Sequence, residues 1–319
     1  MDKLKRILCV LLSLCVIIGF ASCKKDNPDE NVTDNSSTTQ TSNENTKDEI
    51  KVLSLNKEYI SHYEWYEDTS TMLVRSEFSD VTLDKSMEKQ YPLLAKTLLD
   101  TSAMRKRAME DEKDNYLSFA TEEFKKDSES FSTYVSTLDV QVRRADSIAV
   151  SILEDYYADG RRDFNGINYD TESGKELGLA DVFTDTSKIP TVVEKEIMSR
   201  IGEDGPFSNT AVIEYFKNTP EDSITWTLDY NGVTFYFNSG DIAPTNFGVQ
   251  VVTVTFAEYP DLFNKKYTTV PDEYIVSLPV SAPFYTDITG DKKADELIIS
   301  GDYDDDTKFY HTISINSET

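Results

Sequence analysis

The stretch that decides the fold is Trp226–Phe237, "WTLDYNGVTFYF". Trp226, Leu228 and Tyr230 alternate with polar residues, and Val233, Phe235 and Phe237 do the same after Asn231-Gly232. Alternation with a period of two is typical of half-buried strands, and Asn-Gly between two such runs is the strongest local signal for a β-hairpin. The stretch therefore predicts two antiparallel strands with an apolar face turned toward a core.

Strands and helices alternate on both sides of this hairpin. Period-two runs predict strands near 59–67, 72–83, 134–142, 147–157 and 252–256. Helical spacing from Leu94 to Phe124 predicts one long helix, with Asp84 as its N-cap, and shorter helices are expected at 190–201 and 211–218. The sequence predicts an α+β fold, in which antiparallel sheets pack against helices.

Four aromatic residues cluster in "YISHYEWYED", from Tyr59 to Asp68. Tyr59, Tyr63 and Trp65 share one face of the predicted strand, and Tyr66 follows them. Large aromatic side chains are buried on average, so we expect them to pack in the core. The alternative is an exposed platform for a sugar or a protein partner.

The N-terminus has the pattern of a secretory signal. Lys3, Lys5 and Arg6 precede an apolar run at 7–20, which is shorter than the roughly 20 residues that cross a bilayer. Ala21-Ser22 before Cys23 resembles the lipobox of bacterial lipoproteins, although Phe20 stands where leucine is usual. The resemblance implies that residues 1–22 are a signal peptide and that Cys23 is lipidated. The alternative is an ordinary signal cut near Ala21, which leaves a free thiol.

Residues 23–49 form a polar, acidic stretch in which Val32 is the one aliphatic residue. Such a segment buries too little apolar surface to fold, so we expect a disordered tether. The whole chain has a net charge of −26, which disfavours nucleic acid as a partner and attracts basic proteins and cations. We therefore expect a protein of the cell envelope, anchored to a membrane outside the cytoplasm.

Two stretches carry a family resemblance. Arg143–Phe183, with Asn168-Tyr169-Asp170, Ser173-Gly174-Lys175 and the "LADVF" at 179–183, resembles the junction of two extracellular modules. They are the module found beside peptidoglycan deacetylase catalytic domains and the C-terminal module of RsiV-type lysozyme-sensing anti-sigma factors. Tyr230–Val254 resembles the closing hairpin of the second module.

The resemblance implies a deacetylase-associated-type module at 50–170 and an RsiV-type module at 171–270. The remaining residues, 271–319, are expected to form a β extension. Two features depart from the families. No histidine stands in the loop around Gly160, where a Gly-Ala-His sequence is common, and only Met1–Arg6 precede the apolar run, where an anti-sigma factor has a cytoplasmic domain. We expect neither signalling nor deacetylation.

Catalytic chemistry has little support in the sequence. His62 and His311 are the only histidines, and of the three cysteines Cys9 and Cys15 lie within the signal. A histidine–metal site needs clustered imidazoles. Arg161-Arg162 is more simply paired with local acids than free to bind an anion. We therefore predict that the protein is not an enzyme.

One loop has the spacing of a calcium site. In "YTDITGDKKADELII", 285–299, the ligand positions fall on Asp287, Thr289, Asp291, the Lys293 carbonyl and Asp295. Against this, Lys292 stands where glycine is usual and Ile298 where a bidentate carboxylate closes the site. The loop predicts weakly held Ca²⁺, and the rival interpretation is a β-turn leading into a strand.

Three functions follow from these observations. The favoured one is a lipid-anchored, non-catalytic binding module that recognises a basic wall-lytic enzyme of the lysozyme kind, or peptidoglycan itself, through loops near Gly160 and Asp241. The alternatives are a cell-wall hydrolase with carboxylate catalysts that the sequence does not identify, and a passive structural lipoprotein stabilised by calcium.

Overall fold

The computed structural model describes residues 50–67, 69–158, 160–201, 210–278, 283–289, 291, 293–304 and 309–316. The predicted signal peptide, Cys23 and the tether lie outside these residues. Within the described part of the chain, no helix is both long and apolar enough to span a membrane.

The first sheet has five strands in the order β1-β2-β3-β4-β5. They are β1 (Leu55–Trp65), β2 (Met72–Leu83), β3 (Tyr134–Ala145), β4 (Ala149–Ala158) and β5 (Arg161–Asp170). Neighbouring strands are antiparallel except β2 and β3, which run parallel. Parallel neighbours need a crossover connection, and here it is the helix α1 (Pro92–Lys126).

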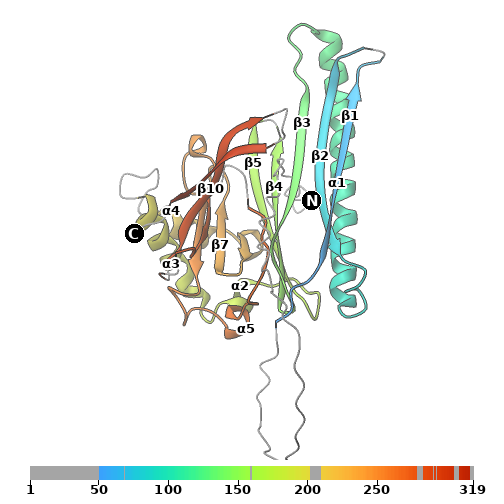
Figure 1. Ribbon diagram of the computed structural model, residues 1–319. Helices are drawn as coiled ribbons and strands as arrows, with labels where there is room; N and C mark the ends of the chain where they lie inside the picture. The colour runs from blue at the N-terminus through green and yellow to red at the C-terminus, as the bar shows by residue number, and fades with distance from the viewer. Residues whose placement is uncertain are drawn as a thin grey trace, which may run out of the picture.

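Helix α1 covers one face of this sheet (Figure 1). Leu94, Leu98 and Met109 of α1 are buried against the sheet residues Leu138, Val140 and Ile152. Within this core, Arg105 of α1 forms ion pairs with Asp80 and Glu154, at 2.5 Å from its Nε to the Glu154 carboxylate. Buried charges need such pairing because their desolvation is costly.

The N-terminal boundary of α1 differs from the prediction. The N-cap is Tyr91, and Pro92 opens the helix. Asp84 instead closes a turn, since its carboxylate accepts hydrogen bonds from the backbone N–H and the hydroxyl of Ser86. Proline is favoured in the first helical turn because its missing N–H would have no partner there.

The second sheet contains the predicted hairpin. Its order is β6-β7-β8, with β6 (Thr225–Leu228), β7 (Gly232–Phe237) and β8 (Gln250–Thr255) all antiparallel. Gly232 is required at the turn, because a Cβ there would lie 2.2 Å from the carbonyl oxygen of Val254. The helices of this part are α2 (Leu179–Val182), α3 (Ile189–Ile201), α4 (Ala211–Asn218) and α5 (Lys265–Thr268), with short 3-10 turns at 186–188, 221–223 and 245–247. Residues of α2, α3 and α4 share one hydrophobic core with this sheet.

A buried ion pair joins the two sheets. The Arg143 guanidinium of β3 donates to both carboxylate oxygens of Asp229, at 3.2 and 2.9 Å, and to the carbonyl oxygen of Ser277. The neighbouring Arg144 pairs with Asp146 and donates to the carbonyl oxygens of Tyr267 and Thr269. These two arginines therefore hold the segment after β8 against the first sheet.

A third sheet follows, in the order β11-β10-β9. Its strands are β9 (Phe284–Thr286), β10 (Asp295–Asp304) and β11 (Phe309–Asn316). Tyr285 of β9 packs with Leu153, Phe164 and Tyr236, so β9 contacts both of the first two sheets. The α+β class, with mainly antiparallel sheets packed against helices, is confirmed.

Candidate functional site

The face of the first sheet that points away from α1 is covered over only part of its length. Near one end, β6 packs on it: the Leu228 N–H donates to Ser151 Oγ at 3.1 Å and to Asn168 Oδ1 at 2.8 Å. The side-chain amide of Asn168 in turn donates to the carbonyl oxygen of Trp226. Toward the other end, where β1, β2 and α1 project beyond the second sheet (Figure 1), this face carries a different set of side chains.

We call this second region the open face. Directly opposed residues of neighbouring strands project to the same side of a sheet. The strand register places three rows of them side by side: Tyr63, Arg75 and Val135; then Ser61, Glu77, Thr137, Tyr157 and Arg162; then Tyr59, Ser79, Asp139 and Asp155. The third row ends at Phe164, which is buried against Tyr236 and Tyr285 and marks where the covered part of the face begins.

Aromatic side chains form the β1 margin of the open face. The exposed fractions of Tyr59, Tyr63 and Trp65 are 61%, 46% and 49%. The prediction that they pack in the core is therefore wrong, although they do share one face of the strand. Strand β1 is an edge strand whose opposite face looks toward α1, so its odd-numbered residues meet no covering layer. Only Tyr66 packs inward, 4.6 Å from the ring of Phe124.

Ion pairs fix the polar residues next to these aromatics. Arg75 Nη2 lies 2.8 Å from Glu77 Oε2, and the Tyr63 hydroxyl donates to Glu77 Oε1 at 2.6 Å. Burial opposes ionisation of Glu77, but the bonds from Arg75 and Tyr63 outweigh it and lower the pKa of that carboxyl. The carboxylate therefore stays charged and orients the Tyr63 ring.

Two buried carboxylates lie at the centre of the open face. Asp139 Oδ1 accepts bonds from Lys57 Nζ at 2.5 Å and Ser79 Oγ at 2.8 Å. Asp155 receives a bidentate pair from Arg162, with both distances 2.7 Å, and a bond from the Gln141 amide. Arg161 pairs with Asp163 at 2.7 Å, so the local pairing expected for Arg161-Arg162 is present.

This arrangement satisfies the acids instead of freeing them for proton transfer. Burial raises the pKa of Asp155, with a further contribution from Asp139, while Arg162 opposes the rise. A raised pKa in a cleft is a feature of catalytic acids. Here, however, both oxygens of Asp155 are already bonded and its side chain is 2% exposed, which leaves no room for a substrate at this carboxyl.

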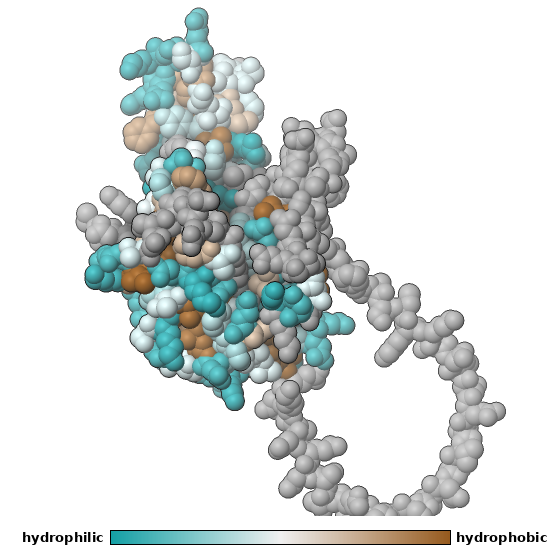
Figure 2. All heavy atoms as spheres, turned by 90° about the vertical axis from the view of Figure 1, so that its left-hand side faces the viewer, coloured by the Kyte–Doolittle hydropathy of each residue, from teal (hydrophilic) through white to brown (hydrophobic). Residues whose placement is uncertain are grey.

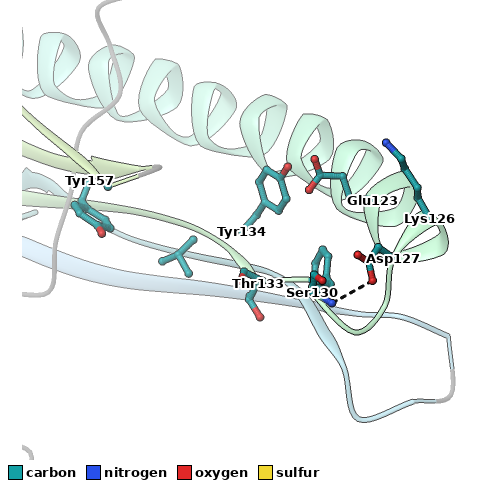
Figure 3. Close-up of a pocket in the computed structure, with 11 residues that line it drawn as sticks. Glu123, Lys126, Asp127, Ser130, Thr133, Tyr134 and Tyr157 are labelled. Carbon is teal, nitrogen blue, oxygen red and sulfur yellow. Dashed lines mark hydrogen bonds between the residues drawn. The ribbon is translucent and has the colours of Figure 1, made fainter.

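A groove of about 690 Å³ lies next to the open face, where α1 ends and β3 begins (Figure 3). Val135 and Tyr157 belong both to the rows described above and to the lining of the groove. The remaining lining comes from the last turn of α1, the connection to β3 and Gly160, which is one of the two loops singled out from the sequence.

A second groove, of about 610 Å³, lies between α4 and the loop after β7. Tyr215 and Asn218 of α4 line one side, and Gly240, Asp241 and Pro244 line the other. This is the other loop singled out from the sequence. On the α3 and α4 side of the molecule, the described hydrophobic residues lie in small groups among hydrophilic ones (Figure 2), as on ordinary protein surfaces.

The residues of the predicted calcium loop connect β9 to β10. Asp287, Thr289, Asp291 and Lys293 lie in the loop, and Asp295 is the first residue of β10, opposite Thr286. Residues 290 and 292 lie outside the described part.

Asp295 holds this loop closed. Its Oδ2 accepts bonds from the N–H groups of Ile288 and Thr289 at 2.8 and 2.9 Å, and these bonds, first that from Thr289, lower the pKa of Asp295. Asp291 similarly accepts a bond from the Lys293 N–H. Among the described residues, no three acidic, histidine or cysteine side chains are grouped around a point that could hold a metal. Calcium binding stays a prediction.

The two histidines lie on strands of different sheets. His62 lies on β1 with its ring stacked on Phe78, at 6.2 Å between centroids. His311 belongs to β11. Cys23, the predicted lipidation site, lies outside the described residues.

Residues 180–257 match a known family, described as a protein family of unknown function, DUF3298. The chain thus contains a DUF3298 domain, built from α2, α3, α4 and the β6-β7-β8 sheet. No curated protein shows a significant match to the chain.

Two solved structures of DUF3298-family proteins are similar to this chain. One, from Bacteroides fragilis, has a TM-score of 0.50 and 16% sequence identity, and the match covers 68% of this chain and 96% of the solved chain. The other, from Pseudomonas aeruginosa, has a TM-score of 0.43 and 14% sequence identity, and the match covers 67% of this chain and 96% of the solved chain. The first comparison shows a shared fold over far more of the chain than the matched segment, and at this identity it shows the fold alone.

Proposed function

We propose that this protein is a non-catalytic binding module of the cell envelope, anchored through lipid on Cys23, and that its open face binds a basic wall-lytic enzyme of the lysozyme kind. The observation that carries the proposal is the exposed aromatic row Tyr59, Tyr63 and Trp65 beside the Arg75–Glu77 pair. Tyrosine, tryptophan and arginine dominate the energetics of protein interfaces, because large rigid side chains bury much surface at low entropic cost.

Charge supports a basic partner. The net charge of −26 creates a negative field that speeds the encounter with a cationic protein, most strongly at low salt. The resemblance of residues 143–183 and 230–254 to a lysozyme-sensing module points in the same direction. Charge alone gives non-specific attraction, so specificity would come from the aromatic row.

The bonding of the central acids supports a binding role over a catalytic one. Asp139 and Asp155 are held by Lys57 and Arg162, so neither resembles the unpaired carboxyl that a hydrolase uses as a general acid. A hydrolase with other carboxylates, and a passive structural lipoprotein, remain the competing functions that the experiment must separate.

The test is a titration of the purified full-length protein with hen egg-white lysozyme at about 0.15 M salt, where long-range attraction is largely screened. We expect saturable binding, and Trp65→Ala should weaken it by about 30-fold, the effect of one interface hot spot. Phe119→Ala is the matched control, because Phe119 is also an exposed aromatic residue, with 59% exposure on α1 against 49% for Trp65.

Each outcome separates the functions. The proposed interface would be contradicted if lysozyme did not bind saturably. It would also be contradicted if Trp65→Ala and Phe119→Ala weakened lysozyme binding equally. Release of soluble fragments when the protein is incubated with peptidoglycan would identify a hydrolase and overturn the non-catalytic assignment. Both variants change exposed side chains, so we expect their stability to stay within about 0.5 kcal/mol of the wild type.

A further inference from the structure

The groove at the end of α1 is built from three separate parts of the chain. Glu123, Lys126 and Asp127 come from the last turn of α1 and its C-cap. Residues 130–135 run from the connection into β3, and Tyr157 and Gly160 come from the end of β4 and the turn to β5. Figure 3 shows these side chains spread along the groove, from Tyr157 at one end to Asp127 and Ser130 at the other.

Two aromatic rings that line the groove pack against aromatic residues of α1. The Phe131 ring meets Phe124 edge-on, at 5.4 Å and 85°, and the Tyr134 ring lies 5.2 Å from Tyr116. Both belong to a small hydrophobic cluster between α1 and the start of β3. Rings fixed in this way lose little conformational freedom when a ligand stacks on them, which favours binding.

Polar groups lie between and beside these rings. Asp127 is fixed because its carboxylate accepts bonds from the N–H groups of Glu129 and Ser130, both at 3.2 Å. The Thr133 hydroxyl donates to the carbonyl oxygen of Met72 at 2.9 Å, and a hydroxyl oxygen that donates can still accept. Ser130 and Ser132 add two more hydroxyl groups to the lining.

The charges of the groove restrict the ligand. Its charged side chains are Glu123, Asp127 and Lys126, two acids and one base, so a phosphate or another anion would meet net repulsion. A purely apolar ligand would desolvate these groups without replacing their hydrogen bonds. The lining suits a ligand with flat apolar faces for the rings and hydroxyl groups for the polar side chains.

We infer that this groove is a binding site for an uncharged oligosaccharide. Sugar rings present an apolar face to Tyr157 and Phe131, while their hydroxyl groups donate to Glu123 and Asp127 and accept from Ser132. A volume of about 690 Å³ is within the range of small-ligand sites. The groove shares Val135 and Tyr157 with the open face but contains none of the aromatic row on β1, and the inference does not depend on the protein partner proposed above.

The probes are the β-linked trimers of N-acetylglucosamine and of glucose, added to the full-length protein and followed by calorimetry. We expect saturable binding of at least one trimer in the millimolar range or tighter. Tyr157→Ala should weaken it at least tenfold by removing a stacking surface, and Ser132→Trp should abolish it by filling the groove. Phe119→Ala, on the exposed side of α1, should leave it unchanged.

The melting temperature of each variant shows whether it is folded. Ser132→Trp keeps the test valid if Tyr157→Ala is unstable, because Ser132 is exposed. Failure of both trimers to bind the wild type would overturn the inference, as would binding that survives both groove substitutions. Lysozyme binding is measured on the same samples. If it persists in Tyr157→Ala while trimer binding is lost, the two sites are distinct.

Discussion

Asp139 and Asp155 lie directly opposite one another on the antiparallel strands β3 and β4, at the centre of the open face. Opposed like charges destabilise a sheet unless each has its own counter-ion. Here Lys57 from β1 pairs with Asp139, and Arg162 from β5 pairs with Asp155. The four side chains therefore tie the outer strands of the sheet to its middle.

This arrangement predicts a pH dependence for Asp155. Burial raises its pKa above the ordinary value of 3.8. A carboxyl whose pKa is raised on folding stabilises the protein while protonated, so its contribution is fully present below pH 3.8 and is lost as the pH rises through the folded-state value. As the pH rises through this range, the free energy of unfolding of the wild type should fall relative to that of Asp155→Asn. Above the folded-state pKa the difference between the two proteins should stay constant.

Urea unfolding of both proteins at several pH values measures the difference. Asp170 provides the control of opposite sign. Burial opposes its ionisation, but bonds from Lys266 and Ser173 lower its pKa, so its contribution is lost as the pH falls. If the difference in free energy of unfolding between the wild type and Asp155→Asn does not change with pH, Asp155 has an ordinary pKa.

The Arg143–Asp229 pair predicts a large effect on stability. Both side chains are 1% exposed, and removing one partner leaves a buried charge without compensation. Asp229→Asn and Arg143→Met should each lower the free energy of unfolding by about 3–5 kcal/mol. The double variant Arg143→Met/Asp229→Leu should recover part of this loss, because it leaves no unpaired charge.

The exposed pair Lys96–Asp100 on α1 is the control for this measurement. Its side chains are 73% and 61% exposed, so Lys96→Ala should cost at most about 1 kcal/mol. If Asp229→Asn has an effect as small as that of Lys96→Ala, the pair contributes little to joining the two sheets.

Local signals predicted most of the helices and strands as far as β8, because they depend on neighbouring residues, but they missed β5 (Arg161–Asp170). The hairpin forms across Asn231-Gly232, and α3 and α4 lie within a residue of their predicted starts. The open face could not be predicted in this way. Its rows depend on the parallel pairing of β2 with β3, two strands that are far apart in the sequence and are joined by the α1 crossover.

The exposed aromatics illustrate the same limit. Periodicity placed Tyr59, Tyr63 and Trp65 on one face of β1, but it cannot tell which face receives a covering layer. That depends on α1, which covers the other side of the sheet. The groove likewise joins Phe131 to Tyr157, which come together through the pairing of β3 with β4. The sequence points to the loop at Gly160, but no local signal marks the end of α1 as part of a site.

Calcium binding by the β9–β10 loop predicts a stability change. A ligand that binds only the folded protein raises the melting temperature by mass action. At calcium concentrations of several millimolar, above the weak affinities of about 10⁻⁴ to 10⁻³ M found in extracellular modules, we expect such a rise. Asp291→Ala should abolish it, since Asp291 supplies a predicted ligand.

Asp291 is a better choice for this test than Asp295, whose bonds to the N–H groups of Ile288 and Thr289 close the loop without any metal. Asp261→Ala, an exposed acid outside the loop, should retain the calcium response. A melting curve of the wild type that calcium does not change would favour the β-turn interpretation of this loop.

The last prediction concerns the anchor. Cys23 would be the one cysteine left after removal of residues 1–22, and a long polar stretch separates it from the first described residue, Ile50. Acyl chains add about 0.8 kcal/mol of membrane affinity for each buried CH₂ group. We therefore expect the wild type in the membrane fraction and Cys23→Ser in the soluble fraction, as measured by fractionation and immunoblotting. Ser22→Ala, which changes a small residue beside Cys23 and keeps the thiol, should stay with the membrane. Retention of Cys23→Ser in the membrane fraction after a high-salt wash would rule out lipid on Cys23 as the anchor.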